Sequence, residues 1–213
     1  MYEYKVCHNQ ALKAVSAFAW SEYGIPVKDF LNNYEICRAK VKSRIVGASS
    51  NNRLLYFSEL ITRFDSKIDV DVAVKLADFY WTAYFSEMKL AEGIEEFIQK
   101  LRHRGVQIAM ITDQVSDTQL RKIRILRIEK LFDFVVTSEE CSGEKKSLAP
   151  FQLLFERTKG KDFGCVWFIG DEIQDWPREV AVTTKIFLAS PYAGKVPRGV
   201  KKICNYKDAC KLI

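Results

Sequence analysis

The chain has 213 residues, of which 48% are hydrophobic and 28% charged, a globular composition that excludes intrinsic disorder and allows a sizeable core. The formal net charge of +6 is spread over amphipathic stretches with acidic residues interleaved, so we expect no nucleic-acid partner. No run approaches the roughly 18 apolar residues that cross a bilayer, and no signal-peptide pattern opens the sequence; we therefore expect no membrane association and a cytoplasmic location.

Residues 11–85 predict a helical region. Apolar residues recur there at spacings of three and four, which is typical of amphipathic helices. Turn signals separate the helices at residues 24–26, 47–52 and 65–71. We accordingly expect an α-helical domain over residues 11–88.

Beyond residue 88 the pattern changes to helices that alternate with short apolar strands. The expected strands are Val106–Thr112, Phe134–Ser138, Cys165–Asp171 and Lys185–Ser190, and the helices that precede the last three are 117–127, 150–159 and 176–182. Unbroken apolar strands that alternate with helices indicate a parallel sheet with both faces covered. The prediction for residues 89–213 is an α/β fold with a doubly wound parallel sheet.

Polar residues follow three of these strands. Thr112 ends the first, Lys145 lies in the loop after the second, and Asp171 ends the third with Asp175 four residues on. Ligands of such sheets bind at the carboxyl ends of the strands. A hydroxyl, an ammonium and two carboxylates are what phosphoryl transfer with Mg²⁺ needs. Thr112 could instead be a helix cap and Lys145 an ordinary solvated side chain. Asp171 and Asp175 are the stronger evidence for this site, because the repulsion between paired carboxylates needs a cation to offset it.

The sequences around these residues read IAMITDQ, GEKKSLAPF and FIGDEIQD, and they resemble the motifs of the haloacid dehalogenase (HAD) superfamily. The resemblance implies that Thr112 binds the phosphoryl oxygens and that Lys145 neutralises the nucleophile and the phosphate. Asp113 stands where many relatives carry a small or amide residue, and we place it with Thr112 and Lys145 among the expected phosphate-binding residues. The resemblance also implies Mg²⁺ as cofactor, held by Asp171 and Asp175 directly or through water. Lys146 is the alternative to Lys145, which we prefer because Phe151 follows it by six residues, as in the family.

The resemblance extends to the helical half, which is similar to the family's inserted cap, and leaves residues 1–10 as a remnant of the entry into the core. The family's first motif, Asp-x-Asp on a core strand, supplies the nucleophile and the general acid and base. It is absent here: the first aspartate is Asp29, and residues 2–15 resemble the segment that follows the motif. That strand lies centrally in the family's sheet, so its absence implies two unpaired strand edges.

Three explanations of the absent Asp-x-Asp motif stay open. The start of the chain is assigned at an internal methionine of a longer protein, which we favour; another chain supplies the upstream piece; or the protein is a decayed or repurposed relative. The main hypothesis is a Mg²⁺-dependent phosphatase of a small phosphorylated metabolite, inactive unless the Asp-x-Asp segment is supplied. The alternative is a catalytically inactive binding or interaction module. A receiver domain fits the length and the late Asp171 poorly, and dehalogenase chemistry needs no metal.

Overall fold

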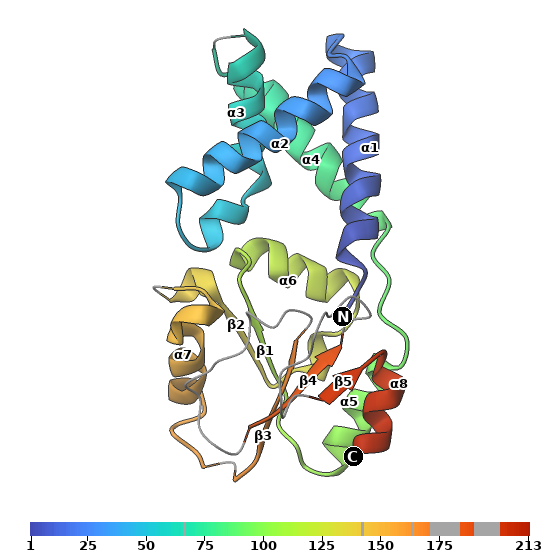
Figure 1. The fold of residues 1–213 in the computed structure, drawn as a ribbon, viewed down its shortest axis with the longest axis vertical. Helices are drawn as coiled ribbons and strands as arrows, with labels where there is room; N and C mark the ends of the chain where they lie inside the picture. The colour runs from blue at the N-terminus through green and yellow to red at the C-terminus, as the bar shows by residue number, and fades with distance from the viewer. Residues whose placement is uncertain (66, 142, 163, 171–183, 190–200) are drawn as a thin grey trace. The chain divides into compact units, whose positions relative to one another are not determined.

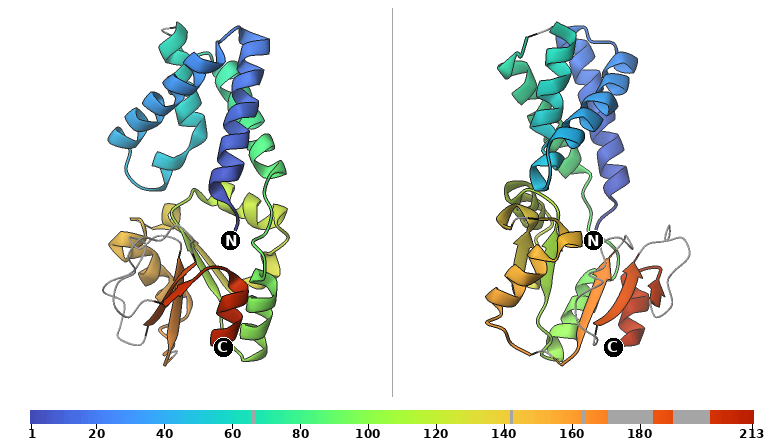
Figure 2. Two further views of the ribbon diagram at one scale, coloured as in Figure 1. Left: turned by 45° about the vertical axis from the view of Figure 1, so that its right-hand side comes forward. Right: turned by 60° about the vertical axis from the view of Figure 1, so that its left-hand side comes forward.

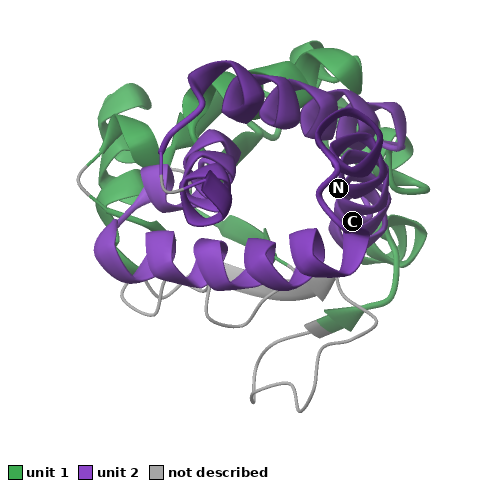
Figure 3. Ribbon diagram, turned by 90° about the horizontal axis from the view of Figure 1, so that it is seen from above, with its two compact units in different colours: residues 1, 90–213 green, residues 2–89 purple. Residues whose placement is uncertain are grey.

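A computed structural model describes residues 1–65, 67–141, 143–162, 164–170, 184–189 and 201–213. The chain divides into two compact units, coloured separately in Figure 3. Unit 1 contains Met1 and residues 90–213, and unit 2 contains residues 2–89. Each unit is built around its own set of packed elements and is described separately.

Unit 2 is made of helices (Figure 1). They are α1 (Tyr4–Tyr23), α2 (Val27–Arg44), the 3₁₀ helix η1 (Ala48–Asn51), α3 (Arg53–Asp65) and α4 (Val70–Ser86). Helix α1 packs along α4, α4 on α3, and α3 on α2. Gly24 ends α1 in a left-handed conformation with φ 68°, and the Asp69 carboxylate caps α4 by accepting a hydrogen bond of 3.0 Å from the Val72 N–H. The helical pattern expected for this half is confirmed.

The first helix begins earlier than the sequence suggested. We expected residues 1–10 to belong to the entry into the core, whereas α1 already starts at Tyr4 and residues 2–10 group with unit 2. The cause is packing, because Cys7 and Ala11 on the first turns are as fully buried as Val15 further along the same helix face. An apolar stripe that begins at Cys7 extends the helix to its first turn.

A buried arginine lies at the centre of unit 2. Arg53 is only 4% exposed, and its guanidinium donates hydrogen bonds of 2.7 Å to the Asn51 carbonyl and 2.9 Å to the Tyr4 hydroxyl. Its Cζ lies 5.4, 5.9 and 5.7 Å from the ring centroids of Tyr56, Tyr80 and Trp81. The charge is thus stabilised by aromatic faces and two hydrogen bonds.

The same cluster keeps a histidine neutral. Burial, and next the charge of Arg53, lower the pKa of His8 to about 4. The neutral ring shares a hydrogen bond of 2.7 Å with the Tyr80 hydroxyl and stacks on Tyr4. His8 therefore acts at neutral pH as a packed polar residue of the helical core.

Unit 1 alternates helices and strands. Its elements are α5 (Ile94–His103), β1 (Ala109–Thr112), α6 (Ser116–Ile125), η2 (Glu129–Leu131), β2 (Phe134–Thr137), η3 (Ser138–Glu140), η4 (Lys145–Ser147), α7 (Ala149–Arg157), β3 (Val166–Gly170), β4 (Thr184–Ala189), β5 (Lys201–Ile203), α8 (Tyr206–Ala209) and η6 (Cys210–Leu212). The predicted α/β class is confirmed. The predicted helix 176–182 lies outside the described residues, and β5 and α8 were not foreseen.

The strands form two parallel sheets. In one, β1 pairs with β2 so that Thr112 lies opposite Thr137; in the other, the order is β3-β4-β5. Among the strands that the structure describes, β1 and β3 are not hydrogen-bonded to each other. Within the described residues, β1 is paired with β2 alone and β3 with β4 alone.

Helices pack against both sheets (Figure 2). Helix α7 contacts β1 and β2, while α8 packs on β5 and on α5. Arg157 of α7 donates a hydrogen bond of 2.7 Å to the Val135 carbonyl, which ties the helix to β2. No helix within the described residues has the length and apolar character needed to cross a bilayer.

Candidate active site

Thr112 ends strand β1 at the edge of the sheet where β2 also ends. Its Oγ1 lies 3.4 Å from the Gln119 Oε1, which is long for a bond between two oxygens, so the hydroxyl can exchange this partner for a better acceptor. Helix α6 begins four residues on, at Ser116. Thr112 is thus the last residue of a strand and precedes a helix N-terminus, an arrangement that favours anions.

Lys145 lies at the same edge because Asp113 holds its loop. The Lys145 backbone N–H donates a hydrogen bond of 2.8 Å to the Asp113 Oδ1, and its Nζ lies 3.8 Å from the Asp113 Oδ2. Burial raises the pKa of Asp113, which the contact with Lys145 partly offsets. The structure therefore brings Thr112, Asp113 and Lys145 together, as the motifs suggested.

The two candidate lysines differ sharply in their surroundings. The Lys145 side chain is 15% exposed, whereas that of Lys146 is 76% exposed and lies 3.3 Å from the Glu144 carboxylate. Of these two lysines, Lys145 is the one with an ion-pair contact to Asp113 in the described structure, with its Nζ 3.8 Å from the Asp113 Oδ2. This difference supports the choice of Lys145 made from the spacing to Phe151.

Two buried oxygens at this edge were missed by the sequence reasoning. The Gln114 Oε1 and the Ser138 Oγ have no hydrogen-bond partner within the part of the chain that the structure describes. Each belongs to a residue within two positions of a strand end, which is the only signal that could have found them. A buried polar atom without a partner is costly, so these oxygens mark where a ligand or water would be stabilised.

The predicted metal ligands Asp171 and Asp175 lie outside the described residues. Strand β3 ends at Gly170, directly before Asp171. Within the described ranges, no group of three or more histidine, cysteine or acidic side chains is placed to hold a metal. The chemistry of the predicted pair, two hard carboxylates, fits Mg²⁺.

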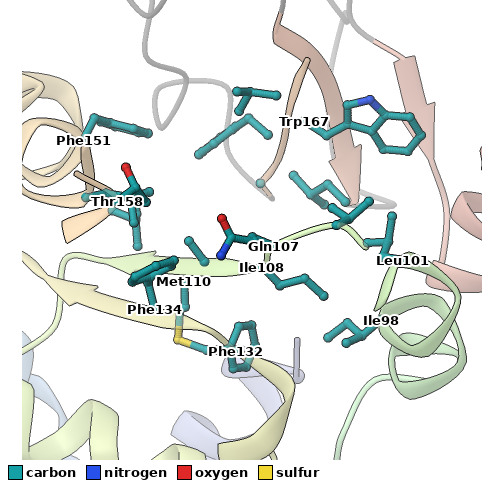
Figure 4. Close-up of a pocket in the computed structure, with 18 of the residues that line it drawn as sticks. Ile98, Leu101, Gln107, Ile108, Met110, Phe132, Phe134, Phe151, Thr158 and Trp167 are labelled. Carbon is teal, nitrogen blue, oxygen red and sulfur yellow. The ribbon is translucent and has the colours of Figure 1, made fainter. Parts of the chain in front are cut away.

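An apolar groove separates the two sheets of unit 1. It has a volume of about 1360 Å³, and both β1 and β3 line it. Figure 4 shows Met110 of β1 and Trp167 of β3 on its walls, with Ile98 of α5 and Phe151 of α7. Lys145 lines it too, which connects the groove to the residues predicted to bind phosphate.

Sequence comparison assigns the chain to a family of hydrolases. The family model for haloacid dehalogenase-like hydrolases matches residues 44–185, and the chain belongs to this family. It is 32% identical over 177 residues, 82% of its length and 73% of the relative's, to a ribulose-1,5-bisphosphate 5-phosphatase of Halopiger xanaduensis.

Two further similarities agree with this assignment. The chain is 26% identical to the pyrophosphatase PpaX of Bacillus pumilus over 145 residues, 65% of this chain and 66% of that protein. The solved structure of the HAD hydrolase YfnB of Bacillus subtilis, bound to magnesium, superposes with a TM-score of 0.65 at 15% identity, covering 99% of this chain and 92% of that one. At that identity the superposition shows the fold alone.

Proposed function

We propose that this chain carries the phosphate-binding and metal-binding parts of a Mg²⁺-dependent phosphatase for a small phosphorylated metabolite. The observation that supports it most is the grouping of Thr112, Asp113 and Lys145 at the carboxyl end of β1. Thr112 donates its hydroxyl to a phosphoryl oxygen, and Lys145 offsets the charge of the group. We assign Asp113 to this phosphate site as the residue that positions Lys145.

The metal assignment rests on Asp171 and Asp175. Both oxygen ligands suit Mg²⁺, and Asp171 directly follows β3. Bound there, Mg²⁺ neutralises charge on the phosphoryl oxygens. A neighbour of the same fold is bound to magnesium, which is consistent with this assignment.

The nucleophile is the missing part. The 213 residues contain no Asp-x-Asp at the end of an apolar strand, and we propose that a segment outside them supplies it. The competing function is a binding module that keeps phosphate affinity without turnover. Phosphate affinity by itself does not separate the two, whereas phosphate release by a chain that carries the added segment does.

The relatives suggest where to look for a substrate. One acts on ribulose 1,5-bisphosphate and the other on pyrophosphate, judged by their names, and both compounds carry two phosphoryl groups. We therefore place sugar bisphosphates and pyrophosphate first, within the broader class of small phosphorylated metabolites. No membrane or nucleic-acid partner is needed for this function.

The test is phosphate release from a panel of sugar monophosphates, sugar bisphosphates and pyrophosphate, with Mg²⁺ or with EDTA. The chain extended by an Asp-x-Asp strand is expected to release phosphate only with Mg²⁺, and Asp171→Asn is expected to raise the Mg²⁺ concentration for half-maximal rate by about 10–100-fold. Phosphate binding without release from any substrate would favour the binding module. An unchanged Mg²⁺ requirement in Asp171→Asn would refute the metal assignment.

Thr112→Val is expected to weaken binding of inorganic phosphate by about 10-fold, because the isosteric side chain removes a hydroxyl donor worth roughly 1–1.5 kcal/mol. Isothermal titration calorimetry on the 213-residue chain measures the affinity for phosphate. Thr62→Val is the matched control, since the Thr62 hydroxyl lies on an exposed face of α3 and donates to the Ser58 carbonyl. Equal phosphate affinity in all three proteins would remove Thr112 from the site.

A further inference from the structure

The buried arginine of unit 2 has no counter-charge among the described residues. Arg53 is 4% exposed, and no described carboxylate forms an ion pair with its guanidinium. The ion pairs in the described part of unit 2 include Glu35 with Arg38, Glu59 with Lys40 and Arg44, and Asp71 with Lys75. Aromatic faces and two hydrogen bonds reduce the cost of burying Arg53, but they leave its charge unbalanced.

The surrounding aromatic residues do not supply the missing negative charge. Burial raises the pKa of the Tyr34 hydroxyl, although the charge of Arg53 opposes the shift. Burial likewise raises the pKa of Tyr80. Both hydroxyls therefore stay protonated at neutral pH, and the neutral ring of His8 beside them carries no charge either.

Two buried polar atoms in this cluster have no hydrogen-bond partner within the described residues. They are the Tyr34 hydroxyl oxygen and the Arg53 Nε. The two side chains are close, because the Tyr34 ring centroid lies 6.0 Å from that of Tyr56 and the Arg53 Cζ lies 5.4 Å from the same Tyr56 centroid. Both groups can donate a hydrogen bond, and buried donors are nearly always satisfied, so we expect an acceptor that the protein itself does not provide.

A second arginine adds to the positive potential of the cluster. Burial, and next the charges of Arg53 and Arg38, lower the pKa of His8. Arg38 is half-exposed and pairs with Glu35 at 3.0 Å, so it contributes less than the unpaired Arg53. The potential in this part of unit 2 favours a negative charge.

A buried water molecule is the plainer occupant of this position. Water can accept a hydrogen bond from each donor, but it leaves the charge of Arg53 unbalanced. An anion satisfies both donors and also offsets the charge. Because Tyr34 is 0% exposed and Arg53 is 4% exposed, the occupant must be small.

We propose that the helical core of unit 2 binds one small inorganic anion of the halide class, which accepts hydrogen bonds from the Arg53 Nε–H and the Tyr34 hydroxyl. The anion offsets the charge of the guanidinium and thereby stabilises the packing of α2 on α3, the helices that carry the two residues. The site lies within unit 2 and does not depend on the proposed phosphatase function.

The test compares the thermal stability of the 213-residue chain in sodium chloride and in sodium gluconate at equal ionic strength. Gluconate is too large for an enclosed site, whereas chloride fits it. Replacing about 200 mM gluconate by chloride is expected to raise the Tm of the helical signal by about 5 °C, measured by far-ultraviolet circular dichroism. An equal Tm in the two salts would overturn the proposal.

Tyr34→Phe tests the second donor without opening a cavity. Its hydroxyl has no partner in the described protein, so the variant is expected to be at least as stable as the original chain in gluconate. The chloride shift is expected to fall to less than half. A full chloride shift in this variant would remove Tyr34 from the site and overturn the proposal.

Tyr23→Phe is the matched control, since it removes the same atom elsewhere in unit 2. Tyr23 is the last residue of α1, roughly 28 Å along the helix axis from Tyr4, which holds Arg53. This variant is expected to keep the full chloride shift, and so is Lys145→Ala in unit 1. Loss of the shift in either control would place the effect of chloride outside the Arg53 cluster and refute the site.

Bromide identifies the occupant directly. In crystals of the 213-residue chain grown in sodium bromide, we expect an anomalous scattering peak in contact with both the Arg53 Nε and the Tyr34 hydroxyl. Density without an anomalous signal would identify water at this position, and the proposal would fail even if chloride raised the Tm.

Discussion

Replacing Lys145 with alanine is expected to weaken binding of inorganic phosphate to the chain by about 10–100-fold, the loss of one charge-assisted hydrogen bond of roughly 1.5–3 kcal/mol. In the chain extended by an Asp-x-Asp strand, kcat/KM is expected to fall by about 10²–10³-fold, since the same charge stabilises the transition state. The reason is placement: the ammonium is largely shielded from water and lies beside Asp113 at the end of β1. Calorimetry measures the first value and phosphate release the second.

Lys146→Ala is the matched control, because the side chains are adjacent and chemically identical. Lys146 is exposed to solvent and pairs with Glu144, so its removal is expected to change phosphate affinity less than twofold. Asp113→Asn keeps an acceptor for the Lys145 N–H but loses the charge that faces its Nζ, and we expect an intermediate loss. Equal losses for the two lysine variants would show that net charge alone, and not position, attracts phosphate.

Arg53→Ala is expected to lower the free energy of unfolding of unit 2 by about 3 kcal/mol. The substitution removes two hydrogen bonds from a charged donor, leaves the Asn51 carbonyl without its partner, and opens a cavity among aromatic rings. Cation–π attraction over Tyr56, Tyr80 and Trp81 adds to the loss. Urea unfolding followed by far-ultraviolet circular dichroism measures the change.

Arg38→Ala gives the comparison. Arg38 lies on the half-exposed face of α2 and pairs with Glu35 one turn away at 3.0 Å, so its loss is expected to cost less than about 0.5 kcal/mol. A cost below about 1 kcal/mol for Arg53→Ala would show that the rings repack without the cation. Arg53 would then be tolerated by the helical core and would not stabilise it.

Two features of the sequence predicted structure correctly: the apolar periodicity of the helices and the positions of strand ends. Apolar spacing predicted the helices of unit 2, and the strand pattern predicted that Thr112 ends a strand, as it does in β1. Strand β1 is shorter than its apolar run: Val106 is well exposed and pairing begins only at Ala109. The length of a strand depends on where a neighbouring strand is available for hydrogen bonding, and an apolar run in the sequence does not show this.

Other features left no trace in the local pattern. The three residues of β5 are too few to show a period. Arg53 reads as an ordinary polar residue at the start of a helix, because its burial depends on Tyr4, Tyr80 and Trp81, which are distant in the chain. The separation of the strands into two sheets leaves no mark on strand composition either, since a strand has the same composition whether one or two partners lie beside it; only the family resemblance pointed to unpaired strand edges.

The hydrogen bond of 2.9 Å between the hydroxyls of Tyr2 and Tyr84 has an evolutionary consequence. Unit 2 begins at Tyr2 and ends at Lys89, and this bond holds its two ends close to each other. A module with adjacent ends can be gained, lost or exchanged at one site in a host chain without stretching the host backbone. Selection can therefore replace the helical module as a whole while the α/β module stays unchanged.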